Sequence, residues 1–294
     1  MWASVGVEPT ERWVDLPTLR TKVRLLEAGE GPPVVFVHGA SNAGTSWASL
    51  AARLPHRRCL LLDRPGCGLS PVAPTPPRDL RQLEVYGDTL VADVLDGLEL
   101  DRASVVGTSF GGYPSLRGTA AHPQRVDHLV LLGWSFGAPI ETTPLSMRIA
   151  GTPVMSKVML AVPPNERMVR SILKQIGLRR AVESGRFGPT EIAWFLALLR
   201  HTATMRNEIE ANPRTLTMRG LNDDVLLGDD VLGAIATPTL FLWGDEDPQG
   251  GAAVAEAFAA RVPGAQLEVL PEMGHAPWID DPNAIATRIE RFLG

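Results

Sequence analysis

The pentapeptide Gly107-Thr108-Ser109-Phe110-Gly111 lies between an apolar run, residues 103–106, and a run that suits a helix, residues 113–121. A chain that turns from strand to helix within so few residues forces its central residue into a strained backbone conformation. Such a turn lifts the Ser109 hydroxyl above the sheet and aims the free N–H groups of the helix start at whatever Ser109 attacks. We therefore predict a nucleophilic serine here, although the same pattern also occurs in ordinary glycine-rich turns.

Strand-like and helix-like segments alternate along most of the chain. Apolar runs predict strands at residues 22–26, 34–37, 59–62, 103–106, 129–132, 239–243 and 266–270, and helical spacing predicts helices at 47–54, 80–98, 113–121, 252–261 and 283–293. Residues 1–20 are expected to be a polar lead-in. This alternation predicts an α/β fold, in which helices flank a mostly parallel sheet.

The alternation stops between residues 134 and 236, where helix-like runs such as 192–200 occur without a convincing strand. We therefore expect residues 1–133 and 237–294 to form one core and residues 134–236 to form an inserted helical cap. The cap holds six of the eight methionines: Met147, Met155, Met159, Met168, Met205 and Met218. Methionine adapts to irregular apolar ligands, so these residues are candidates for substrate contacts. Ordinary packing between helices is the alternative explanation for their number.

Composition narrows the function classes. The formal net charge of −5 argues against non-specific binding to nucleic acids or to acidic membranes. Cys59 and Cys67 are the only cysteines, too few for a disulfide framework; we expect Cys59 in the core and Cys67 as an exposed thiol in a loop. The sequence shows neither a secretory signal pattern nor an apolar run of roughly 18 residues. We expect a cytoplasmic protein that acts on a small molecule, and nothing indicates its oligomeric state.

A serine nucleophile needs a base, a carboxylate that orients the base, and donors for the oxyanion. In a parallel sheet these groups come from loops at the carboxyl ends of strands. His275 follows the last predicted strand and is the expected base. Asp247 follows the strand at 239–243 and is the expected carboxylate, with Asp245 as its rival and a merely solvated turn as the alternative.

The oxyanion donors are expected from two backbone N–H groups. One belongs to Phe110, directly after the predicted nucleophile, and the other to Ala40, in the loop after the strand at 34–37. His38 also lies at the end of that strand, but it precedes the nucleophile and opens a glycine turn. We expect His38 to hold the oxyanion loop in place rather than to act as the base.

Together these motifs resemble the α/β-hydrolase fold. The similarity rests on His38-Gly39, the stretch Asp63-Arg64-Pro65-Gly66-Cys67-Gly68-Leu69-Ser70, the turn at Ser109, Gly244-x-x-Asp247 and Gly274-His275. It covers about residues 22–133 and 237–294, and the order serine, acid, histidine is that of the family. The resemblance implies a carboxylesterase-like serine hydrolase with a helical cap and without a metal or cofactor.

Residue identities at the expected site distinguish this chain from several branches of the fold that it resembles. Epoxide hydrolases and haloalkane dehalogenases carry Asp where this chain has Ser109, and hydroxynitrile lyases use a lysine near the histidine that is missing here. Meta-cleavage C–C hydrolases usually have Trp directly after the histidine, where this chain has Ala276.

Hydrolysis of an ester, thioester or lactone of a mainly apolar small molecule is the leading expectation. C–C bond hydrolysis and a non-catalytic, ligand-binding member of the fold remain the alternatives. The expected substrate contacts are Trp134, Met155, Met159 and Trp278.

Overall fold

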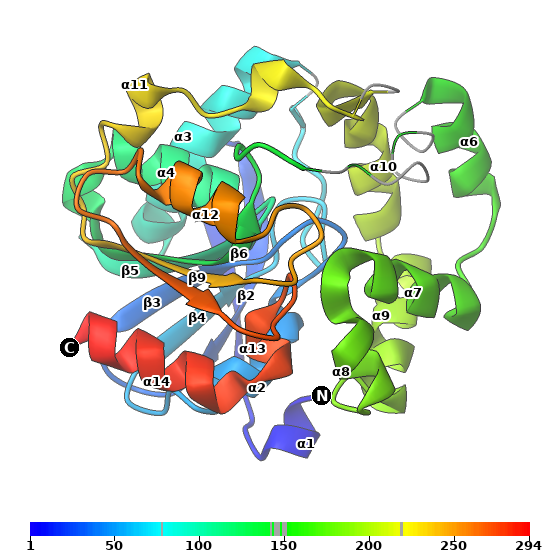
Figure 1. Ribbon diagram of the computed structural model, residues 1–294, viewed down its shortest axis with the longest axis horizontal. Coiled ribbons are helices and arrows are strands. Elements are labelled where there is room, and N and C mark those ends of the chain that lie inside the picture. The colour runs from blue at the N-terminus through cyan, green and yellow to red at the C-terminus, as the bar shows by residue number, and fades with distance from the viewer. Residues whose placement is uncertain (78, 142, 144–147, 149–151, 218–219) are drawn as a thin grey trace.

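The computed structural model describes residues 1–294 except 78, 142, 144–147, 149–151 and 218–219 (Figure 1). Its centre is an eight-stranded sheet in the order β1-β2-β4-β3-β5-β6-β9-β10. The strands are β1 (Thr10–Leu16), β2 (Thr21–Ala28), β3 (Pro33–Val37), β4 (Arg58–Leu62), β5 (Ala103–Ser109), β6 (Val126–Ser135), β9 (Thr239–Gly244) and β10 (Gln266–Leu270). The strands from β4 to β10 in this order are parallel, and β2 is antiparallel to both β1 and β4. The predicted mostly parallel α/β sheet is confirmed.

The N-terminal segment differs from the prediction of a polar lead-in. It contains a short helix, α1 (Trp2–Val5), and the edge strand β1, which pairs with β2 as a hairpin. Five of the seven β1 residues are exposed or polar, and only Val14 and Leu16 are buried. An edge strand with so few buried positions lacks the apolar run by which buried strands are recognised.

Helices cover both faces of the sheet. One face packs against α3 (Leu80–Gly97), α4 (Gly112–Ala121) and α12 (Ala252–Ala259), and the other against α2 (Ala48–Ala51), α13 (Pro277–Asp280) and α14 (Pro282–Leu293). The alternation along β3 shows this two-sided burial, since Val35 and Val37 face the first group and Val34 and Phe36 face the second. The sheet is therefore buried on both sides, and a site is accessible only at its strand ends.

The chain between β6 and β9 is mainly helical, as the sequence predicts. It forms α6 (Pro153–Ala161), α7 (Glu166–Leu173), α8 (Arg179–Glu183), α9 (Pro189–His201), α10 (Thr204–Thr215) and α11 (Asp229–Leu232). It also forms two strands of two residues each, β7 (Leu216–Thr217) and β8 (Gly220–Leu221), where no strand is expected. The expected boundary at residue 134 falls inside β6, which continues to Ser135.

Figure 1 shows α6 to α10 grouped on one side of the core, whereas α11 lies with α3 and α4. We use the word cap for α6–α10. Buried side chains of α7, α8 and α9 belong to the same apolar cluster as α2, α13 and α14. The cap therefore packs continuously with one face of the core. None of the helices in the described parts of the chain is long and apolar enough to cross a membrane.

Candidate active site

Ser109 ends β5 with a positive φ of 51°, in the left-handed region that a residue with a Cβ rarely adopts. The preceding residues of β5 are buried, whereas Ser109 is half-buried and lines a cavity. A Cβ added to Gly39 would stand 2.8 Å from the Ser109 Cβ, so the loop after β3 passes the serine at a distance that only glycine permits. The turn has the strained geometry that the sequence predicts for it.

His275 and Asp247 meet in the buried space beside this turn. The His275 Nδ1 lies 2.9 Å from the Asp247 Oδ2, and both side chains are almost fully buried. Because a carboxylate only accepts hydrogen bonds, this pairing places the imidazole proton on Nδ1 and leaves Nε2 as an acceptor. His275 and Ser109 line the same cavity.

The Asp247 carboxylate is itself held by the backbone. Its Oδ2 accepts a hydrogen bond of 2.8 Å from the Trp134 N–H, and its Oδ1 accepts one of 3.0 Å from the Gln249 N–H. Asp245, the rival in the sequence, is exposed to solvent. The geometry therefore brings Asp247, and not Asp245, to His275.

The backbone N–H groups of Ala40 and Phe110 are available to a ligand. Within the described residues, neither N–H takes part in a backbone hydrogen bond. Ala40 lines the cavity together with Ser109, and Phe110 lies between Ser109 and the start of α4 at Gly112. Two free donors beside the serine are the requirement for an oxyanion hole.

His38 lies behind this loop and is fully buried. Its Nδ1 donates to the Gly39 carbonyl oxygen at 2.8 Å, and its Nε2 accepts from the Arg64 N–H at 3.1 Å. Burial first, and the nearby Arg64 cation second, hold the pKa of His38 well below its usual value. A neutral imidazole with both nitrogens engaged in the backbone fits the structural role that the sequence predicts for His38.

The cavity above Ser109 has a volume of about 680 Å³. Its lining includes Ser109, His275 and Ala40, together with residues of α1 and the start of α14. The cap contributes an apolar wall made of Ile172, Leu173, Ile176, Phe187, Trp194 and Phe195. A cavity of this size and lining suits a small, largely apolar molecule.

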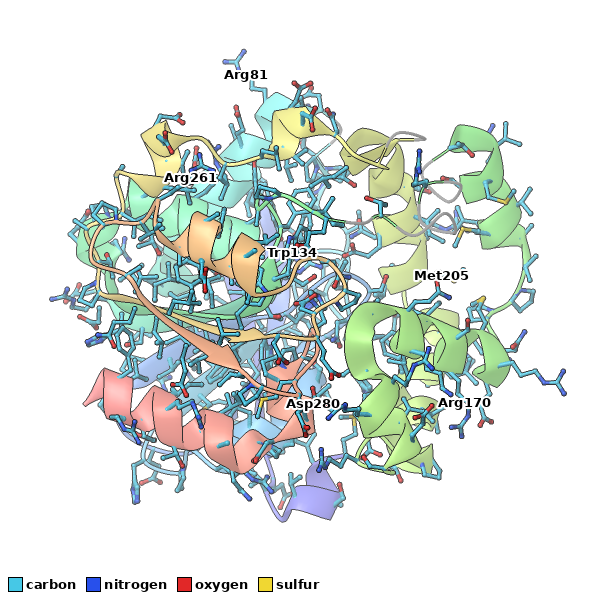
Figure 2. The ribbon with its side chains drawn as sticks, in the orientation of Figure 1. Arg81, Trp134, Arg170, Met205, Arg261 and Asp280 are labelled. Atoms are coloured by element: carbon cyan, nitrogen blue, oxygen red, sulfur yellow. The ribbon has the colours of Figure 1, made fainter. Side chains whose placement is uncertain are left out.

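Of the four expected substrate contacts, only Trp278 lines this cavity. Trp134 is buried and donates its Nε1–H to the Pro139 carbonyl, and Met155 and Met159 lie on α6, away from the lining. Figure 2 shows Trp134 in the core and Met205 among the cap helices. Met147 and Met218 lie outside the described residues. The cap wall therefore comes from α7 to α9, where aromatic and branched residues at helical spacing are the only sequence signal.

Comparison with known proteins identifies the family. The sequence profile of the alpha/beta hydrolase family matches residues 34–288. The chain is an α/β hydrolase. The 2-hydroxy-6-oxononadienedioate/2-hydroxy-6-oxononatrienedioate hydrolase of Cupriavidus pinatubonensis is 28% identical to it over 97% of this chain and 96% of that one.

Solved structures of other α/β hydrolases share the fold. The 2-hydroxy-6-oxo-6-phenylhexa-2,4-dienoate hydrolase of Rhodococcus sp. strain RHA1 superposes with a TM-score of 0.79 at 20% identity, over 97% of this chain and 99% of that one. Carboxylesterase CesB of Bacillus subtilis superposes with a TM-score of 0.77 at 20% identity, over 99% and 94%. The family is thus shown, and these two neighbours carry names for different reactions.

Proposed function

We propose that this α/β hydrolase cleaves a carboxylic ester, thioester or lactone of a mainly apolar small molecule through an acyl-enzyme on Ser109. His275 Nε2 takes the Ser109 hydroxyl proton while Oγ attacks the carbonyl carbon. The N–H groups of Ala40 and Phe110 stabilise the negative oxygen. His275 then gives the proton to the leaving oxygen or sulfur, the acyl–enzyme bond forms, and water, activated by the same His275, releases the acid.

The proposal rests mainly on one observation. Ser109, with its strained φ of 51°, opens into the same cavity as His275, whose Nδ1 is fixed by Asp247 at 2.9 Å. The strain has a cost in stability that a plain turn would avoid with glycine. A base oriented by a buried carboxylate, with a serine hydroxyl that opens into the same cavity, is the arrangement that acyl transfer requires.

C–C bond hydrolysis is the second candidate, and similarity favours it. The Cupriavidus relative, whose name is that of a dienedioate hydrolase, aligns over nearly the whole chain. Against it, Ala276 occupies the position after His275 where meta-cleavage hydrolases usually have tryptophan. The apolar cap wall accommodates an acyl chain equally well in either reaction.

A fluorophosphonate probe tests the nucleophile, since it phosphonylates an activated serine. We expect labelling of the wild-type protein and none of Ser109→Ala, with a drop in kcat of about 10⁴-fold for the variant. Hydrolysis of a panel of p-nitrophenyl esters, thioesters and lactones, compared with a 2-hydroxy-6-oxo-dienoate, then decides the bond. Turnover of the dienoate but not of the esters would overturn the ester proposal, and absence of labelling would favour a non-catalytic role.

A further inference from the structure

Arg64, in the loop after β4, is almost fully buried directly behind the loop that carries Ala40. Its side chain is only 3% exposed. Its Nε donates to the His38 carbonyl oxygen and its Nη2 to the Gly39 carbonyl oxygen, both at 3.0 Å. A guanidinium with donors in a fixed fork thus fixes two successive carbonyls of one loop.

The Gly39 carbonyl and the Ala40 N–H belong to the same peptide group. In a trans peptide these two bonds point in opposite directions, so a carbonyl held towards Arg64 turns the Ala40 N–H away from it. The Gly39 oxygen accepts twice, from Arg64 and from His38 Nδ1. Hydrogen bonds accepted by a carbonyl polarise its amide and strengthen the N–H as a donor.

Arg64 also contacts the side chain of Phe110, the residue that carries the second expected oxyanion donor. Its guanidinium lies 4.6 Å from the centre of the Phe110 ring. A cation over an aromatic face is attracted by the ring, which restrains the residue that follows Ser109. One buried cation therefore holds the backbone that carries the Ala40 N–H and packs against the side chain of Phe110, whose N–H is the other expected donor.

The cap supplies the counter-charge. Glu208, on α10, accepts from the Arg64 Nη2 at 2.7 Å, and the Cys67 thiol donates to the same carboxylate oxygen at 3.1 Å. The prediction that Cys67 is exposed is wrong: its side chain is buried, and this burial raises the pKa of the thiol. A buried ion pair whose partner lies on the cap links the position of α10 to the oxyanion loop.

We infer that Arg64 is a positioning residue that orients and polarises the Ala40 N–H through the Gly39 carbonyl, and that Glu208 connects α10 of the cap to this function. The inference rests on the proposed function in one respect, because it assumes an oxyanion opposite Ser109. It adds a group that does not touch substrate and acts only through the backbone. Its contribution is therefore made to the transition state rather than to substrate binding.

Arg64→Lys tests the inference, since lysine keeps the charge but cannot donate to two carbonyls and a carboxylate in one plane. We expect kcat to fall by about 10- to 100-fold, less than the loss of a whole oxyanion donor. KM should change by less than about 3-fold. Glu208→Gln keeps an oxygen acceptor for Nη2 and should lower kcat by less than about 10-fold.

Two inhibitors separate positioning from a general structural effect. A trifluoromethyl ketone forms an oxyanion on Ser109, whereas the matching amide binds without one. In Arg64→Lys, the inhibition constant of the ketone should rise by the factor by which kcat/KM falls, and that of the amide should stay constant. Arg117→Lys is the matched control, because Arg117 is partly buried and forms two hydrogen bonds with Asp88 of α3 rather than with the oxyanion loop.

The enzyme concentration used to calculate kcat is that of the protein that the fluorophosphonate labels, so that misfolded protein does not lower the measured kcat. Unchanged kcat in Arg64→Lys would overturn the inference, as would ketone and amide constants that rise together. Equal losses of kcat in Arg64→Lys and Arg117→Lys would also overturn the inference. Failure of the wild-type protein to react with the probe is a different result, because it contradicts the proposed nucleophile and not the role of Arg64.

Discussion

Gly177, in the turn between α7 and α8, lies directly against the backbone of His275. A Cβ added to Gly177 would stand 2.9 Å from the His275 nitrogen and 2.8 Å from the Pro248 Cδ. Its φ of 86° interrupts the helical path, and the next helix, α8, carries Arg180, which pairs with Glu246 and Glu272 at 2.6 Å and 3.0 Å. The cap therefore contacts both loops that carry the expected acid and base.

Gly177→Ala should disturb this contact. We expect the free energy of unfolding to fall by about 1 kcal/mol from the positive φ alone, with a further loss from the close approach to His275. The kcat should fall and the KM should rise, because His275 moves with its loop. Gly185→Ala is the matched control, since Gly185 has a φ of 78° and nothing within 4 Å of its added Cβ. Thermal unfolding and steady-state kinetics measure the difference, and equal behaviour of the two variants would contradict the role of the contact.

Asp247→Asn should lower kcat by roughly 10²- to 10⁴-fold, because an amide in place of the carboxylate no longer holds the His275 proton on Nδ1. The same change also places an NH₂ group near the Trp134 or Gln249 N–H, which both donate to the carboxylate now. Asp245→Asn changes an exposed side chain and should leave kcat nearly unchanged. Steady-state kinetics rank the two variants. A larger loss of kcat in Asp245→Asn would show that Asp247 is not the acid of the triad.

Trp194→Ala should change the preference for acyl-chain length, because Trp194 lines the cavity and is only half-buried. Removing the ring enlarges the cavity, so longer or bulkier esters should gain in kcat/KM relative to short ones. Met159→Ala is the control, since Met159 lies on α6 outside the cavity lining. Competition between p-nitrophenyl esters of increasing length measures the preference. A shift in Met159→Ala but not in Trp194→Ala would contradict the assignment of the cap wall to α9.

The sequence predicts the core strands and the meeting of Asp247 with His275 because each depends on local patterns. Parallel strands place their carboxyl ends at one edge, so short motifs after β5, β9 and β10 come together once the topology is known. No such rule applies to contacts between cap and core. Arg64 and Glu208 are 144 residues apart, and neither has a neighbour in the sequence that indicates the other.

The cap residues that line the cavity are likewise not predictable from the sequence. Methionines on α6 and aromatic residues on α9 have equally plausible helical spacing, and only the tertiary packing decides which face borders the cavity. The sequence shows no strand signal for β1 for a related reason, because this edge strand has only two buried side chains.

The buried imidazole of His38 should make the stability depend on pH. Burial lowers the pKa of His38 well below 6.5, so below about pH 6.5 the unfolded chain binds a proton that the folded protein excludes. The free energy of unfolding should therefore fall as pH drops from about 6.5, by up to about 1.4 kcal/mol per pH unit for this group.

His38→Asn keeps an N–H for the Gly39 carbonyl but does not titrate, so its free energy of unfolding should depend less on pH between pH 6.5 and pH 5. His56→Asn is the control, because His56 is exposed. Urea unfolding at several pH values gives the slopes. If His38→Asn lost stability as steeply as the wild-type protein while His56→Asn did not, protonation of His38 would not be the cause.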